Sequence, residues 1–348
     1  MNIRLGLALA LLACLLCAIY PRHTLADETA AAVSRACRWL ASQQRQDGSI
    51  SWRSPRLDPN VWETANALIA LLQCGSTVDR AVINQGFAFL DANWTEEGGL
   101  PESSGRRLSH LGYCVETTST GIRAYAAAGK RAQAEKLREF LFSVQEPDGG
   151  WKIGYPEAKT FPNGEVLEVY PSVTGFALAG AAAVPVKGPN VDRGLVWLAA
   201  RQKATGDWGA FWDYFGIPYY ATAQIVSAFV AWGRPDDPVV ERALRFTRDH
   251  QNPDGSWGDA PEPFTPSREL WTALALLTLQ AAGDKGEQDS IQRGIAFLLD
   301  RQQPDGRWIG GFFKSEIVAD TEKKEDVYTT SLAIIALTQS RDSGRPRE

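Results

Sequence analysis

A recurring turn motif is the feature of this sequence that most limits its possible folds. The segments QEPDGGW, QNPDGSW and QQPDGRW repeat a glutamine, an Asp-Gly pair and a tryptophan at constant spacing. QKATGDW and QRQDGSISW are variants, the second with a two-residue insertion before its tryptophan, and TEEGGLP is a degenerate sixth copy. A period of about 50 residues indicates repeated units that are each stabilised by their neighbours.

Two kinds of helical segment alternate between these turns. The first kind is amphipathic and charged and ends in glutamine, as in AEKLREFLFSVQ and QRGIAFLLDRQ. The second kind is apolar on nearly all sides, as in TANALIALLQCG and TALALLTLQAAG, which predicts burial on both faces. Six segments of the second kind align without gaps on one hydroxyl position, namely Thr64, Thr118, Ser172, Thr222, Thr272 and Thr330. We therefore predict an all-α fold in which six outer helices surround six inner helices as a closed double ring.

The motif itself is predicted to join neighbouring units rather than to bind a ligand. The Asp-Gly pair forms a turn in which glycine takes a positive φ. The glutamine is expected to bond free N–H groups at the start of a neighbouring helix, and the tryptophan to cover the apolar joint.

The first residues are separate from the repeats. A cationic MNIR, an apolar LGLALALLACLLCAIY and a small-residue site ending at Ala26 are typical of a secretory signal peptide. The apolar run is short for a spanning helix, which needs about 20 residues. We predict a signal peptide over 1–26, a six-repeat toroid over 27–341 and a polar tail over 342–348. The mature protein is then exported, to the periplasm or outside the cell, without an integral membrane domain; an uncleaved N-terminal membrane anchor is the alternative.

Charge and cysteine content exclude several classes. The formal net charge of −5 and the lack of a basic stripe argue against a nucleic-acid partner. The mature chain keeps Cys37, Cys74 and Cys114, an odd number without CxxC spacing. This pattern predicts neither a disulfide scaffold nor a zinc motif, so the three cysteines are expected as buried thiols.

The repeats resemble those of the prenyltransferase/squalene-cyclase superfamily. Its QW repeat reads Arg or Lys, a small residue, an aromatic residue, glutamine and Gly-x-Trp, and RGIAFLLDRQQPDGRW and RGLVWLAARQKATGDW fit that pattern. The resemblance covers essentially all of the mature chain and implies an (α/α)6 toroid of six helix-pair repeats.

The catalytic signatures of that superfamily are missing from this sequence. The DxDD motif, with which class II terpene cyclases protonate an alkene, does not occur. Thr329 stands where protein prenyltransferases have a zinc-binding histidine, and no Asp-x-Cys pair precedes it. We therefore predict no metal and no cofactor, and fold alone does not settle the chemistry.

Loop lengths indicate where a site would lie. Loops of roughly 12 to 25 residues lead into the inner helices, and long loops inside one domain are usually functional. The starts of the inner helices carry a ring of aromatic side chains and carboxylates. The candidate ligand-binding residues are Trp62, Tyr170, Tyr220, Trp271, Tyr328, Glu269 and Asp326. The structural alternative is that the aromatic residues pack between helices and the acids cap helix N-termini.

Two acids at this rim are candidates for catalysis. Glu116 and Glu63 are the candidate general acids, because a carboxyl group desolvated among aromatic side chains can stay protonated. Helix N-termini and loop cations at the same rim suit an anionic group of a ligand. Those cations are Arg106, Arg107, Arg268 and Lys314.

Three functions remain open at this point. The first is a terpenoid-cyclase-like toroid that binds an isoprenoid, a lipid or another hydrophobic small molecule in a central cavity, with lyase- or isomerase-type chemistry if it turns over. The second is a glycan-processing toroid, which needs two rim carboxylates about 5–10 Å apart. The third is a non-catalytic scaffold for a protein partner.

Overall fold

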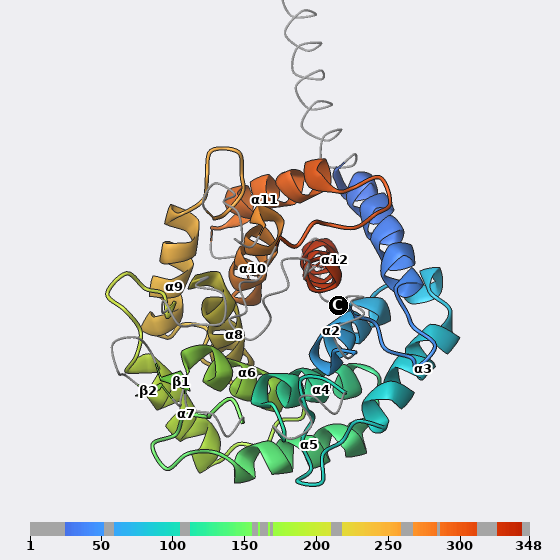
Figure 1. Ribbon diagram of the computed structural model, residues 1–348. Helices are drawn as coiled ribbons and strands as arrows, with labels where there is room; N and C mark the ends of the chain where they lie inside the picture. The colour runs from blue at the N-terminus through green and yellow to red at the C-terminus, as the bar shows by residue number, and fades with distance from the viewer. Residues whose placement is uncertain are drawn as a thin grey trace, which may run out of the picture.

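A computed structural model describes residues 25–51, 59–104, 112–154, 170–209, 218–258, 267–283, 286–311 and 326–342, and the backbone of 159–160 and 166–167. The helices form two concentric rings, which Figure 1 shows along the ring axis. No helix within these ranges is both long and apolar enough to cross a membrane.

The inner ring consists of the apolar segments. Its helices are α2 (Val61–Leu72), α4 (Val115–Ala127), α6 (Pro171–Ala181), α8 (Pro218–Ala231), α10 (Arg268–Ala281) and α12 (Asp326–Asp342). Each packs on the next, and α12 packs on α2, so the inner ring is closed. These helices are buried along almost their whole length, as their uniform apolarity predicts.

The outer ring consists of the amphipathic segments. Its members are residues 25–42, α3 (Arg80–Asp91), α5 (Arg131–Ser143), α7 (Pro189–Ala199), α9 (Pro238–Asp249) and α11 (Gln288–Arg301). A 3-10 turn, η1 (Gly75–Thr77), follows α2, and β1 (Lys159–Thr160) pairs antiparallel with β2 (Val166–Leu167) in the loop before α6. The predicted toroid of six helix pairs is confirmed. The pair of two-residue strands, β1 and β2, is an addition inside a loop.

Local sequence explains where the helices start. Asn60 accepts the Glu63 N–H at 2.7 Å, and Ser267 accepts the Leu270 N–H at 3.1 Å. Side-chain acceptors of this kind satisfy amide groups that the first turn leaves unbonded. Proline begins α6, α7, α8 and α9, where its missing N–H costs nothing.

The hydroxyl column binds the turn motif to the inner ring. Thr64, Thr118, Thr272 and Thr330 each accept a backbone N–H from the turn of their own unit, at 3.0–3.1 Å. In the third unit Thr174 does so, at 3.0 Å, and the assignment of Ser172 to this column was wrong. The reason is that α6 begins at Pro171, so Thr174 is its fourth residue, as Thr64 is in α2.

The motif tryptophans are structural, as predicted. Their rings are essentially inaccessible, and each Nε1–H donates to a carbonyl ten residues earlier, at 2.6–2.8 Å. They are Trp151, Trp208, Trp257 and Trp308. In the first unit the expected insertion before Trp52 does not describe the structure, because Ile50 takes the tryptophan position and its N–H bonds Thr64. Trp52 itself lies outside the described residues.

The motif glutamine bonds a carbonyl, which reverses the predicted polarity. Its Nε2 donates both to the turn glycine and to the first turn of the next outer helix, as Gln145 does to Gly149 and Asn190, each at 2.8 Å. Its Oε1 accepts from the arginine that opens the next repeat, as Gln145 does from Arg193 at 2.7 Å. An amide carries both donors and an acceptor, so the arginine of one unit and the glutamine of the preceding unit form a single joint.

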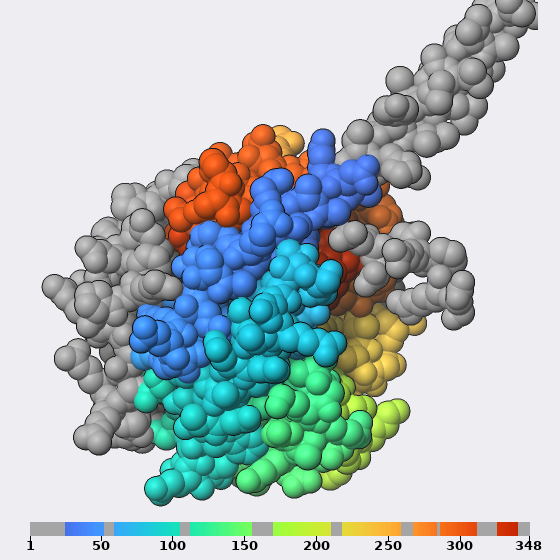
Figure 2. All heavy atoms as spheres, turned by 90° about the vertical axis from the view of Figure 1, so that its right-hand side faces the viewer, coloured from blue at the N-terminus to red at the C-terminus, as the bar shows by residue number. Residues whose placement is uncertain are grey.

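The same joint closes the ring between the two ends of the domain. Gln302 donates to Ala32 at 2.8 Å and accepts from Arg35, which links the sixth unit to the first. Figure 2 shows the first outer helix lying between α11 and α3. Ring closure therefore rests on the repeat motif itself rather than on a special contact.

The turn glycine in this joint gives a stability prediction. Gly306 has a φ of 101°, and a Cβ built on it would lie 2.6 Å from the Arg35 carbonyl oxygen. Gly306→Ala combines left-handed strain with a backbone clash, so we expect a loss of about 2–4 kcal/mol in unfolding free energy, measured by urea denaturation. Gly283 is the matched control, because its φ is 77° and nothing lies within 4 Å of the same Cβ. Equal losses for Gly306→Ala and Gly283→Ala would show that the clash is relieved at no cost.

One cysteine expectation was wrong. Cys37 in the first outer helix and Cys74 after α2 form a disulfide, with a Cα–Cα distance of 6.0 Å. Cys114 is the buried free thiol that was expected. The odd number of cysteines gave no indication of this pair, since Cys37 and Cys74 come together only in the folded ring.

Candidate functional site

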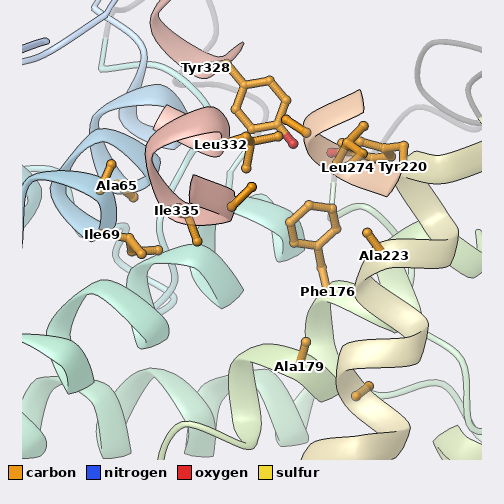
Figure 3. Packing of buried hydrophobic residues seen from close by; sticks show 14 of the residues in the cluster. Ala65, Ile69, Phe176, Ala179, Tyr220, Ala223, Leu274, Tyr328, Leu332 and Ile335 are labelled. Atoms are coloured by element: carbon orange, nitrogen blue, oxygen red, sulfur yellow. The ribbon is translucent and has the colours of Figure 1, made fainter. Parts of the chain in front are cut away.

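Apolar side chains of five inner helices converge on the ring axis. Figure 3 shows them from close by, packed between the inner helices. They are Ala65, Ile69, Phe176, Ala179, Tyr220, Ala223, Leu274, Tyr328, Leu332 and Ile335. All belong to the buried core, so the axis is an apolar environment screened from water.

The remaining inner helix, α4, supplies polar groups instead. The Tyr220 hydroxyl of α8 donates to Glu116 Oε2 of α4 at 3.0 Å, and Arg123 Nη1 of α4 donates to Gln224 Oε1 of α8 at 3.3 Å. Helices α4 and α8 both pack on α6, so these two contacts between α4 and α8 span α6. Phe176 of α6 lies against Tyr220, with ring centroids 5.3 Å apart, which places the Glu116–Tyr220 contact on the axial side.

Two glycines of α6, Gly175 and Gly180, allow α4 and α8 to approach each other closely across this helix. A Cβ on Gly180 would lie 2.7 Å from the Ser119 carbonyl of α4, and one on Gly175 would lie 2.8 Å from Ile225 of α8. Glycine at these positions lets the neighbouring helices come close, so long side chains of α4 and α8 meet over α6.

Glu116 is the acid that the structure places best for chemistry. Its side chain is 5% exposed, in the first turn of α4, and it accepts from the fully buried Tyr220. The N-terminus of a helix and a phenol donor both favour a negative charge on such a carboxyl group. The arrangement can stabilise the carboxylate that a proton transfer from Glu116 would leave.

The buried Cys114 is the N-cap residue of the same helix. Burial, and secondly the charge of Glu116, raise the pKa of the Cys114 thiol to about 12. A thiol with this pKa stays protonated and unreactive at neutral pH.

Trp62 and Tyr328 form an aromatic pair across the α2–α12 joint. Their ring centroids are 4.3 Å apart and the rings are inclined by 41°. Within the described part of the chain, Trp62 Nε1 has no hydrogen-bond partner. Tyr328 points to the axis in Figure 3, so this pair continues the wall that Phe176 and Tyr220 form.

Three other candidates contact outer-ring or loop groups. Glu269 accepts from Arg301 of α11 at 3.2 Å, and Asp326 accepts from the Gly310 N–H at 2.8 Å with Arg307 Nε at 3.3 Å. Trp271 packs on Tyr219, with centroids 5.9 Å apart. These contacts are those of helix starts and inter-helix packing.

The remaining candidates lie at helix starts. Glu63 is 1% exposed in the first turn of α2, and Tyr170 is the N-cap residue of α6, at 9% exposure. Arg268 pairs with Asp254 at 3.2 Å. Arg106, Arg107 and Lys314 lie outside the described residues.

Arg123 is a polar residue of this centre that sequence reasoning missed. Apart from Arg341 at the end of the last inner segment, it is the only charged residue within the six aligned apolar segments, and that isolation was the available signal. Burial is the main cause that lowers the pKa of its guanidinium, and the Tyr328 phenol partly opposes the effect. Among the described residues, no group of three or more His, Cys, Asp and Glu side chains is placed to hold a metal ion.

Comparison with known proteins points to one family. The family model of the squalene-hopene cyclase C-terminal domain matches residues 57–211 and 209–342. A probable squalene–hopene cyclase of Sinorhizobium fredii is 27% identical over 303 residues, covering 73% of this chain and 45% of the relative. A drimenyl diphosphate synthase of Streptantibioticus cattleyicolor is 25% identical over 297 residues, covering 79% of this chain and 52% of the relative. The chain thus spans about half the length of these relatives.

Solved structures share the fold. A variant of the type II terpene cyclase MstE from Scytonema, in complex with its substrate geranylgeranyl dihydroxybenzoate, superposes with a TM-score of 0.71 at 18% identity, covering 92% of this chain and 99% of that chain. A glycosidase variant superposes with a TM-score of 0.60 at 14% identity, covering 92% and 98%. At these identities both comparisons concern the fold alone, a toroid that different chemistries use.

Proposed function

The chain belongs to the squalene-hopene cyclase C-terminal domain family, and we propose that it is an exported toroid that binds an isoprenoid or a similar hydrophobic ligand on its axis. The observation that carries the proposal is the gathering of buried apolar and aromatic side chains from five inner helices around the ring axis. Sites for small apolar ligands have this composition, with few polar groups to fix orientation. Here Glu116 and Arg123 are those groups.

We propose further that Glu116 is the proton donor for lyase- or isomerase-type chemistry. The carboxyl proton would pass to one carbon of an alkene, whose π electrons form the new C–H bond and leave a carbocation. Tyr220 would stabilise the resulting carboxylate through the hydrogen bond it already makes, and the faces of Phe176 and Tyr220 would stabilise the cation. Loss of a proton from the cation to the same carboxylate restores the enzyme, so the balance needs no co-reactant.

The first test is ligand retention. Native mass spectrometry of residues 27–348 purified from the exporting host, followed by organic extraction, should show a co-purifying isoprenoid or lipid. A protein that co-purifies with no ligand and gains no mass when polyprenyl compounds are added would contradict the proposal.

The second test addresses Glu116. Glu116→Gln keeps the size and the Tyr220 contact but removes the proton, so we expect turnover of a retained ligand to fall by about 10²–10⁴-fold. Product formation is followed by gas chromatography with mass detection. Glu269→Gln is the matched control, because that acid faces Arg301 and should leave turnover unchanged. Full activity of Glu116→Gln would assign proton transfer elsewhere.

Two alternative functions rank below this one. A glycan-processing toroid is suggested by the shared fold of a glycosidase variant, but sugar chemistry needs two available carboxylates, and Glu269 and Asp326 are held by arginines of the outer layer. A protein scaffold needs no residue such as Glu116 on a buried axis. Mass spectrometry distinguishes both from a lipid-binding toroid.

Export is proposed on the signal-like N-terminus, whose residues 1–24 lie outside the described part of the chain. The Cys37–Cys74 disulfide supports it, because disulfides persist mainly in oxidising compartments. Residues 25–42 are helical, so cleavage after Ala26 would leave the first outer helix nearly whole.

A further inference from the structure

Arg123 lies on the same face of α4 as Glu116. The two are seven residues apart, which is two helical turns and about 10 Å along the helix. Both reach α8 over α6, Glu116 at Tyr220 and Arg123 at Gln224, and the two residues of α8 are themselves one turn apart. Arg123 therefore lies deeper in the ring than Glu116, on the same axial side of α6.

Among the described residues the charge of Arg123 has no ion-pair partner. No carboxylate of these residues lies within ion-pair distance, and its one hydrogen bond is to Gln224 at 3.3 Å. A guanidinium has five N–H donors and stays protonated in proteins. Arg123 is partly exposed, but desolvation is the main cause that lowers its pKa, and a largely desolvated charge without a counter-ion is costly.

Two buried carboxylates of this chain show how the fold pairs structural charges. Buried Glu269 and Glu287 are bound by Arg301 and Arg248, at 3.2 and 2.9 Å. The buried Arg138 donates to the Val184 carbonyl at 2.8 Å. Among the described residues Arg123 has instead the amide oxygen of Gln224 and the nearby Tyr328 phenol, and no carboxylate.

We propose that Arg123 and Gln224 form a subsite for the oxyanion of an amphipathic isoprenoid, a carboxylate or a phosphate. The inference rests on the proposed function and narrows its substrate class. Gln224 Oε1 is bonded to Arg123, so its Nε2 donors can bind the same oxyanion. The hydrocarbon chain then runs from Arg123 past Phe176 and Leu332 toward Glu116, so the reacting alkene lies several carbons from the anionic end. A pure hydrocarbon would leave the guanidinium unneutralised.

Binding of three probes with one prenyl chain tests the subsite. Farnesoic acid, farnesyl phosphate and farnesol are titrated into the mature wild-type protein and into Arg123→Met, with dissociation constants from calorimetry. Wild type should bind at least one anion about 30-fold more tightly than farnesol, and Arg123→Met should lose that preference while binding farnesol within about threefold of wild type. The anion that binds more tightly identifies the group that the subsite takes as a carboxylate or a phosphate.

The controls separate two kinds of failure. Arg123→Met removes a largely desolvated charge that has no carboxylate partner among the described residues, so folding should not suffer, which circular dichroism and thermal melting check. Arg131→Met, on the exposed face of α5, should keep the preference. If wild type binds the anions and the alcohol equally, or if Arg123→Met keeps the preference, the proposed subsite is contradicted but the proposed function is not. Absence of binding by all three probes overturns the proposed function as well.

Discussion

Alanine in place of Trp257 should lower the free energy of unfolding by about 3–5 kcal/mol. The indole is completely buried, its Nε1–H donates to the Thr247 carbonyl of α9, and its backbone N–H bonds Thr272 of α10. Its ring edge also fills the space beside Gly294 of α11. This residue thus joins three helices of two units, and removal of its side chain leaves a cavity that helices fixed in a closed ring cannot collapse.

Equilibrium urea denaturation followed by circular dichroism measures this loss. Trp94 is the matched control, since it stands in the degenerate second unit, is only half-buried and bonds Tyr125 at 3.2 Å. We expect Trp94→Ala to cost about 1–2 kcal/mol. A Trp94→Ala loss equal to that of Trp257→Ala would mean that the motif tryptophans do not hold the ring together.

Much of this ring could be predicted from the sequence because its signals are repeated. Periodicity separated inner from outer helices, and in four of the six units the predicted hydroxyl accepts the turn N–H. The alignment failed in the third unit, where Pro171 moved a helix start by two residues relative to its hydroxyl. The role of the glutamine was reversed for a different reason. An amide offers both donor and acceptor, and only the backbone geometry decides which of them meets the next helix.

The candidate site could be predicted only in part. The alignment of the inner helices placed Glu116 and Tyr220 individually at the inner rim. Their hydrogen bond could not be predicted, because it depends on how closely α4 and α8 approach each other across the glycines of α6. Glu269 and Asp326 were equally good candidates in the sequence, and arginines of the outer layer bind them. Arg123 was missed because the search stopped at helix starts, whereas its isolation inside an apolar helix marks it.

Reduction of the Cys37–Cys74 disulfide should lower the free energy of unfolding by about 4 kcal/mol. The bridge spans 37 residues and ties the first outer helix to the end of the first inner helix. Without it the unfolded chain gains the conformational freedom of that loop. The first outer helix is also the one that α11 must meet to close the ring, so its loss of anchorage should weaken the Gln302–Ala32 joint.

The measurement compares urea midpoints with and without dithiothreitol for wild type, Cys37→Ala/Cys74→Ala and Cys114→Ala. The double variant should match reduced wild type and be insensitive to the reductant, while Cys114→Ala should keep the full response, because its thiol is free. The intact mass of protein recovered from the exporting host should be two hydrogens below the fully reduced mass. If the protein purified from the exporting host has three free thiols, the disulfide is contradicted. The support that the disulfide lends to export is then also lost, because an oxidising compartment should form a disulfide that the folded ring holds in place.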